Sequence, residues 1–159
     1  MAPQGLSVWA RAQRTLQPHE AWETFRPWIE RDNPRMAFNV ARGLVFGSMI
    51  TEADRGWAEL MRQEARARMA YLLSPRTILC LPTTPFPAPK KGLPLPVLAP
   101  LRDRITCLCS HAGLSGVPQV SIPGATVDGL PIGLSIVGAR GEDAMLVAVA
   151  RALEAAVRH

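Results

Sequence analysis

The chain has 159 residues, of which 48% are hydrophobic and 19% are charged, a balance typical of a globular rather than a disordered protein. This length fits one domain or a piece of a larger one. The net charge of +5 comes almost wholly from arginine, because the only lysines are Lys90 and Lys91. The arginines are dispersed and no aromatic residues alternate with them, so the pattern indicates a solvated surface and disfavours nucleic-acid binding.

The N-terminal third of the chain is predicted to be helical. Residues His19–Glu30 carry apolar side chains at helical spacing, and Pro27 predicts a kink or an end to that helix. The apolar residues of Met36–Val45 predict a second helix that ends near Gly47.

The clearest helix signal follows Thr51. This threonine and Asp54, three residues later, resemble a capping box, and no proline interrupts the run to Ser74. The pattern predicts one apolar face that packs in the core rather than binding a cofactor. Its members are Trp57, Leu60, Met61, Ala65, Met69 and Leu72.

The middle of the chain predicts one short strand and a proline-rich segment. Residues Thr77–Leu81 form an apolar run that Pro82 stops. The segment Pro82–Pro100 holds seven of the fifteen prolines, which predicts an extended and irregular conformation. It fits either a linker between domains or a long surface loop within one domain. A helix is expected over Leu101–His111.

The last third predicts a β-hairpin followed by a helix. Gln119–Ile122 and Pro131–Val137 are strand-like, and Asp128-Gly129 supplies a turn signal between them. In the second strand Gly133 alternates with apolar residues, as does a serine, and their small size suits close cover of one face. Glu142–Val157 is an amphipathic helix. Helices with a hairpin sheet indicate an α/β or α+β class.

No catalytic or metal centre is visible from the residues alone. Ser115 lies four residues from His111, but the second glycine directly follows the serine, which is the wrong spacing for a nucleophile elbow, and no third group orients the base. We therefore expect a turn before Pro118 rather than a dyad.

The three cysteines fit neither a disulfide framework nor a common zinc pattern. Cys107 and Cys109 are separated by one residue, and Cys80 lies in an apolar run where burial is expected. We expect no metal and no cofactor. No apolar run reaches the ~18 residues of a membrane span, and residues 1–14 hold no apolar stretch of the signal-peptide kind. A cytoplasmic location without a membrane partner is therefore expected.

Several segments together resemble the C-terminal part of the amidase signature family. They are Leu81-Pro82-Thr83-Thr84-Pro85, the run from Ala112 to Pro123, the run from Asp128 to Gly138 and the acidic pair Glu142-Asp143. The upstream stretches Arg14–Gln17, Glu20–Trp22 and Val40–Arg42 are also similar to this family. Order and spacing agree, so the match extends over nearly the whole chain.

This resemblance implies the C-terminal portion of the amidase signature fold, of α/β class, in which a mixed sheet is flanked by helices and a β-hairpin precedes a closing helix. Residues 1–159 would form a partial amidase domain, with a helical region at 1–76, a strand and Pro-rich loop at 77–100, and a helix, the hairpin and the C-terminal helix at 101–159.

The resemblance also implies the hydrolysis of a carboxamide to an acid and ammonia. The family uses a serine nucleophile, a second serine in a cis peptide and a lysine, with the serines in a Gly-Gly-Ser-Ser-Gly-Gly-like loop. This sequence has no Gly-Gly pair, and neither lysine lies in the matching context, so no catalytic residue is assigned. The partners implied are a small-molecule amide in the complete enzyme, and either the missing N-terminal half of the domain or a second copy in a homo-oligomer.

The residues expected to contact substrate are Arg42, Thr83 and Thr84. Arg42 is a candidate for a polar or carboxylate group, with a structural surface role as its alternative. The threonines are candidates for the pocket wall, and their alternative role is to cap the end of the strand. Two other readings of the whole chain stay open: a non-enzymatic scaffold or subunit, and part of an A-type subunit of a glutamyl or aspartyl-tRNA amidotransferase.

Overall fold

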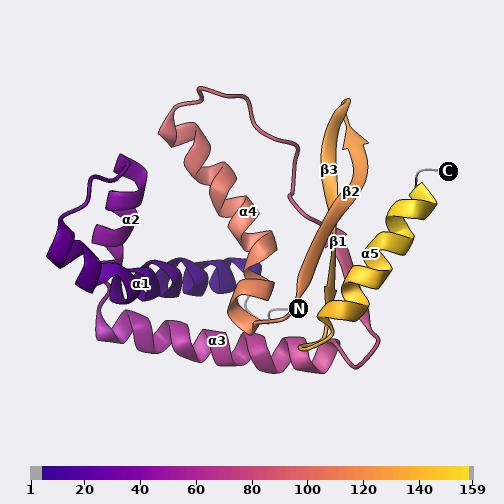
Figure 1. Ribbon diagram of the computed structural model, residues 1–159, viewed down its shortest axis with the longest axis horizontal. Coiled ribbons are helices and arrows are strands. Elements are labelled where there is room, and N and C mark those ends of the chain that lie inside the picture. Colours follow the sequence, from indigo (N-terminus) through magenta and orange to yellow (C-terminus); the bar gives the residue numbers. More distant parts are fainter. Residues whose placement is uncertain (1–4, 158–159) are drawn as a thin grey trace.

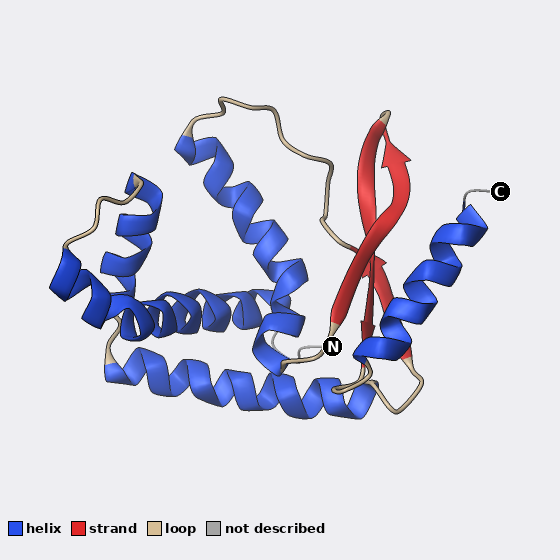
Figure 2. Ribbon diagram, viewed as in Figure 1, coloured by secondary structure: helices blue, strands red, loops and turns tan. Residues whose placement is uncertain are grey.

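The computed structural model describes residues 5–157, and within them four helices lie beside a small sheet whose other face carries a fifth helix (Figure 1). In chain order the elements are α1 (Leu6–Asp32), α2 (Phe38–Ser48), α3 (Glu52–Leu72), β1 (Ile78–Pro82), α4 (Leu95–Ser115), β2 (Gln119–Val127), β3 (Leu130–Gly138) and α5 (Asp143–Val157). Figure 2 shows that the strands lie together on one side of the molecule, away from α2.

The helix α1 is longer than the sequence predicts and runs through both Pro18 and Pro27. The expected end at Pro27 is therefore wrong, and the helix begins well before His19. An interior proline costs about 3 kcal/mol because it removes a backbone donor and crowds the preceding turn. The cost is offset because α1 packs against α2, α3 and α4, and its N-terminal half buries Trp9 and Leu16.

The helices α1 and α2 approach each other closely at one glycine. The second helix lies where it was predicted and ends at Ser48, beside Gly47. A Cβ added to Gly47 would lie 2.1 Å from the backbone oxygen of Pro18. No side chain can occupy that space unless the two helices separate.

The predicted start of α3 is confirmed. The Oγ1 of Thr51 accepts a hydrogen bond of 3.1 Å from the backbone N–H of Asp54, which satisfies one of the free donors of the first turn. The helix ends at Leu72, just before the predicted limit at Ser74.

The predicted apolar face of α3 is only partly buried. Met69 and Ala65 are in the core, but Leu60 is 66% exposed and Leu72 is 39% exposed, so the expectation is wrong for these two leucines. The buried row is centred on Ala58, Ala65 and Met69, whose small or flexible side chains let α1 and α4 come near, whereas Leu60 lies to one side of that row.

The strand β1 forms one residue later than predicted, and the helix after it begins earlier. α4 starts at Leu95, inside the segment expected to be irregular, because Pro94 serves as its N-cap and Pro96 occupies its first turn, where a proline loses no helical hydrogen bond. Pro100 also lies within this helix. The expectation for Pro82–Pro100 is therefore confirmed only for its first part.

The three strands form an antiparallel sheet in the order β1-β3-β2. The predicted hairpin is confirmed, with Asp128 at φ 51° and Gly129 at φ 75° in its tight turn. The register slips between Pro123 and Ala125. The α/β class and the closing helix are also confirmed, whereas the parallel pairings of a mixed sheet stay a prediction for the rest of the domain.

The sheet separates two apolar clusters. On one face Val137 packs with Leu114, Met69 and the N-terminal part of α1. On the other face Ile136 packs with Leu146 and Ala150 of α5. Cys80 is exposed on the edge strand β1, which corrects the expected burial, since no described residue covers that position. No helix within residues 5–157 is long and apolar enough to cross a membrane.

We predict that Gly47→Ala lowers the free energy of unfolding by about 1–3 kcal/mol, because the added methyl group forces α2 away from Pro18. Gly43 of the same helix is the matched control: a Cβ there meets nothing within 4 Å, so Gly43→Ala should stabilise by up to about 1 kcal/mol through helix propensity. Urea unfolding followed by circular dichroism measures both. Equal effects at the two glycines would contradict the close approach.

Candidate functional site

The face of the sheet opposite α5 changes from apolar to polar along the strands. At one end Leu79, Leu81 and Val137 pack in the helical core. Towards the other end the same face carries Ser135, and then Thr83, which extends β1 by donating its backbone N–H to the oxygen of Gly133 at 2.8 Å. The polar end lies where the chain leaves β1 for the proline-rich segment, and it is the candidate functional site.

Four side chains form a connected hydroxyl cluster at this end: Gln119, Ser121, Ser135 and Thr83. The Oγ1 of Thr83 lies 2.7 Å from the Oγ of Ser121 and 2.8 Å from the Oγ of Ser135. The Nε2 of Gln119 donates to the Oγ of Ser135 at 2.8 Å. Ser135 is completely buried, whereas Ser121 is exposed, so the cluster extends from the interior to the surface and presents a positioned hydroxyl there.

Two neighbours fix the space around the hydroxyl cluster. A Cβ at Gly133 would lie 2.7 Å from both the Oγ of Ser121 and the Oγ1 of Thr83, so only glycine leaves room for their hydrogen bond. From α4, the Sγ of Cys109 donates to the backbone oxygen of Thr83 at 3.2 Å. Burial raises the pKa of the Cys109 thiol, which therefore stays protonated and serves as a donor rather than as a nucleophile.

Thr84 shapes the loop that leaves the hydroxyl cluster. Its Oγ1 donates to the backbone oxygen of Phe86 at 2.8 Å, and the guanidinium of Arg104 lies 5.4 Å from the centre of the Phe86 ring. The loop is thereby held against α4. The two threonines thus differ: Thr83 belongs to the cluster, whereas Thr84 caps a local turn.

The third predicted site residue, Arg42, does not join the threonines. It is exposed on α2, which packs on α1 and lies on the far side of α4 from the sheet (Figure 1). Beside it, α1 and α2 enclose an apolar groove of about 420 Å³, whose lining includes Phe25, Trp28, Met36, Val40 and Leu44 but not Arg42.

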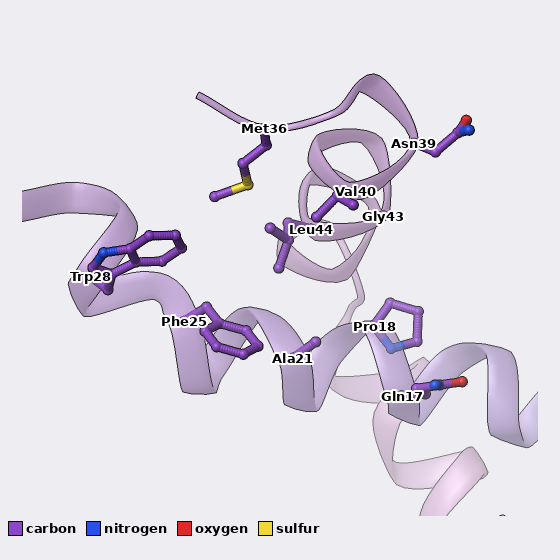
Figure 3. A pocket seen from close by; sticks show the side chains of 10 residues that line it. All are labelled: Gln17, Pro18, Ala21, Phe25, Trp28, Met36, Asn39, Val40, Gly43 and Leu44. Atoms are coloured by element: carbon purple, nitrogen blue, oxygen red, sulfur yellow. The ribbon is translucent and has the colours of Figure 1, made fainter. Parts of the chain in front are cut away.

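Figure 3 shows how the groove is built. The rings of Phe25 and Trp28 come from α1 and stand edge to face, with centroids 6.4 Å apart, below Met36 and Leu44. Asn39 extends away from these apolar side chains. The groove therefore suits an uncharged apolar group.

The serine and histidine on α4 do not form a catalytic pair. The Oγ of Ser115 donates to the backbone oxygen of His111 at 2.6 Å, and the Nδ1 of His111 lies 2.8 Å from the oxygen of Leu108. The Nε2 of His111 is buried and has no partner among the described residues. Burial lowers the pKa of His111, so its ring is held neutral inside the helical core. Ser115 ends the helix before Gly116, which agrees with the expected turn.

The described residues contain no group of three or more His, Cys, Asp or Glu side chains that could hold a metal ion. The hydroxyl cluster itself carries no ionisable carboxylate, imidazole or amine. It can therefore donate and accept hydrogen bonds and can position a neighbouring group, but it holds no base to activate a nucleophile.

Sequence reasoning found Thr83 but missed its partners Gln119, Ser121 and Ser135. A signal for them exists in the alternation of the hairpin strands, where these side chains point to the face opposite Val120, Ile122 and Ile136. Small polar residues on a strand face that borders the core indicate hydrogen-bonding partners on the neighbouring strands. The sequence alone does not show which strands are neighbours.

Comparisons with known proteins converge on one family. The family model described as Amidase matches residues 10–147. Amidase 1 of Oryza sativa is 33% identical over 93% of this chain, and the A subunit of the glutamyl-tRNA(Gln) amidotransferase of Thermus thermophilus is 31% identical over 92%. A crystal structure of an amidase superposes with a TM-score of 0.73, at 29% identity over 91% of the chain.

The chain spans about a third of the length of these proteins, namely 34% of Amidase 1, 32% of the A subunit and 34% of the crystallised amidase. The resemblance to the C-terminal part of an amidase signature hydrolase is thereby confirmed.

We predict that Thr83→Val lowers the free energy of unfolding by about 1–3 kcal/mol, because the hydroxyls of Ser121 and Ser135 lose their shared partner. Thr106→Val on α4 is the matched control, since its hydroxyl makes one exposed bond to the backbone oxygen of Arg102. Urea unfolding would compare them. A cost at Thr83 no larger than at Thr106 would show that the hydroxyl cluster contributes nothing to the fold.

We also predict a pH dependence that originates in His111. Because its folded-state pKa lies below that of the unfolded chain, about 6.5, its contribution to stability is complete above that pH and declines as the pH falls towards the folded value. The loss reaches at most about 1.4 kcal/mol per pH unit. His111→Gln should flatten the decline between pH 7.5 and 5.5, and His19→Gln should leave it in place. A decline that His111→Gln leaves unchanged would assign it to other groups.

Proposed function

This chain belongs to the amidase family, and from that premise we propose that it is the C-terminal segment of an enzyme that hydrolyses a carboxamide to an acid and ammonia. The single observation that carries the proposal is the family match over residues 10–147 in a chain that spans about a third of its relatives. The serine, cis-serine and lysine implied by the family are assigned to the part of the enzyme outside this chain.

In this proposal the hydroxyl cluster and Thr84 form the polar wall of the substrate pocket. The exposed hydroxyl of Ser121 is the contact point, because buried partners fix its orientation through Thr83. Pre-orientation of this kind lowers the cost of binding a polar group or a catalytic loop, since little rotational freedom is lost.

Arg42 and the groove between α1 and α2 form a second contact region in this proposal. Arg42 is exposed and takes a polar or carboxylate group of the substrate, and the groove takes an apolar group. Because α4 separates α2 from the sheet, one small substrate cannot touch Arg42 and Thr83 together within this chain. Arg42 is therefore assigned to larger substrates or to a different part of the same pocket.

The same proposal assigns the missing part of the domain as the partner of this chain. The helix α2 and its C-cap leave Phe38, Val45, Phe46 and Met49 exposed, with Phe38 and Met49 each 72% accessible. Apolar surface of this extent on a small protein is commonly covered by a further segment or chain. The division into regions 1–76, 77–100 and 101–159 and a cytoplasmic location are further proposals for the complete enzyme.

A role in an amidotransferase A subunit is the second candidate, favoured by the match to the Thermus thermophilus subunit. Both candidate functions release ammonia from an amide. The hydrolase releases it to solvent, whereas the amidotransferase passes it to an acceptor. The scaffold reading differs from both because it needs no substrate at the hydroxyl cluster.

We expect the purified chain to release no ammonia from hexanamide, benzamide or glutamine, because residues 5–157 hold no hydroxyl or thiol that is activated by a base. A chimaera in which this chain replaces the matched third of Oryza sativa Amidase 1 should release ammonia. In the chimaera Thr83→Val should lower kcat/KM about 10-fold, which is about 1.4 kcal/mol of transition-state stabilisation, while Thr106→Val should not.

Each outcome of this assay separates the readings. Turnover by the chain alone would contradict the assignment of the catalytic groups elsewhere. A folded chimaera without activity, judged by circular dichroism and gel filtration against the rice enzyme, would favour the scaffold. Equal activity of the Thr83 and Thr106 variants would remove the hydroxyl cluster from the site and leave the family assignment intact.

A further inference from the structure

A separate pocket of about 270 Å³ lies where α3 and α4 end and where the chain leaves β3. We name it the arginine pocket. Its lining includes Arg66, Met69, Leu73, Ser115, Val117 and Arg140. All three elements end here, so side chains from segments far apart in the sequence converge on one small volume.

The two arginines of this pocket lack the partners that other arginines of α3 have. Arg55 is paired with Glu52, and Arg62 with Glu20 and Glu59. Among the described residues no carboxylate lies within ion-pair distance of Arg66 or Arg140, and no acidic residue lines the pocket. Both arginines line the pocket and are exposed, so they bring positive charge to it without an internal counter-charge.

The floor of the arginine pocket is apolar. Met69 and Leu73 are buried there, and Val117 and Ala139 complete the surface. The last carbonyl groups of α3 and α4 also point towards this end, and their negative partial charge disfavours an anion deep in the pocket. The anionic group of a ligand is therefore favoured at the solvent-exposed side, near the two exposed arginines, while an apolar group is favoured on the buried Met69 and Leu73.

The arginine pocket lies far from Thr83, the residue that joins the two serines of the hydroxyl cluster. Thr83 is paired with Gly133, whereas the pocket begins at Ala139, six residues further along the chain of β3. At the rise of a β-strand this separation is about 20 Å. A small ligand in the pocket therefore cannot touch Thr83, whereas Gln119, which pairs with Val137 two residues before Ala139, lies nearer to the pocket.

We propose that the arginine pocket binds a small organic carboxylate, with the carboxylate between Arg66 and Arg140 and the apolar part on Met69 and Leu73. A planar guanidinium donates two parallel hydrogen bonds to a carboxylate, which gives the site its preference for this group. The apolar floor adds a preference for a carboxylate with a short hydrocarbon tail over an inorganic anion. This site stands apart from the proposed amide hydrolysis and does not depend on it.

The test titrates the 159-residue chain with hexanoate, hexanamide and inorganic phosphate, followed by ligand-observed NMR. Hexanoate should bind, and hexanamide and phosphate should bind at least about 10-fold more weakly, since each lacks one of the two features the site recognises. Arg66→Gln and Arg140→Gln should each raise the Kd for hexanoate at least about 10-fold. Arg35→Gln removes the same charge from an exposed position outside the pocket and should leave the Kd unchanged.

A second measurement does not depend on the stability of the variants. Phenylglyoxal modifies accessible arginines, and mass spectrometry locates the modified residues in the unaltered chain. Hexanoate should protect Arg66 and Arg140 and leave Arg35 reactive. Binding of phosphate as tight as that of hexanoate, or equal protection of all three arginines, would overturn the organic carboxylate assignment, and so would the absence of both binding and protection.

Discussion

The central strand β3 is the constraint on which the other elements depend. It is hydrogen-bonded to β1 on one edge and to β2 on the other, and its adjacent residues Ile136 and Val137 are both fully buried on opposite faces. Burial of two neighbouring strand residues requires a layer on each side of the sheet, because successive side chains alternate. The helix α5 supplies one layer, and α4 with α3 and α1 supplies the other.

The same strand also determines where the polar site forms. Towards its start β3 carries the small residues Gly133 and Ser135, which leave room on the face that α4 also contacts through Cys109. The vacated space is taken by the hydroxyl of Thr83, which joins serines of both hairpin strands. One strand therefore contributes apolar side chains to the core at one end and hydrogen-bonding side chains to the site at the other. The packed core holds the strand, and with it the site, in place.

Local chemistry made part of this fold predictable. A threonine cap, a tight Asp-Gly turn and an amphipathic period each act within a few residues, so Thr51, the hairpin and α5 follow from the sequence directly. The errors concern long-range packing. Pro27 is tolerated because three other helices hold α1, and Leu60 is exposed because the spacing alone does not reveal which side of α3 meets them.

The site was predictable to a smaller extent for the same reason. Thr83 followed from the family resemblance, but Ser121 and Ser135 join it only because β1 pairs with β3 rather than with β2, and pairing order is a property of the whole sheet. Thr84 and Thr83 were both expected to line the pocket. The side chain of Thr84 instead donates a hydrogen bond to the backbone oxygen of Phe86 in the loop that follows. Arg42 was also expected to contact substrate, and α4 lies between its helix α2 and the sheet.

The geometry of the hydroxyl cluster gives none of its hydroxyls a base of its own. A hydroxyl becomes a strong nucleophile only beside a base, and the three hydroxyls of the cluster are bonded to one another and to Gln119 instead. The histidine nearest in the sequence, His111, is buried with one nitrogen occupied by a backbone oxygen, and Cys109 keeps its proton. What the chain supplies is fixed orientation of neutral donors and acceptors. That contribution accelerates a reaction only when a base and a nucleophile are brought to it, which is the role proposed for the remaining part of the enzyme.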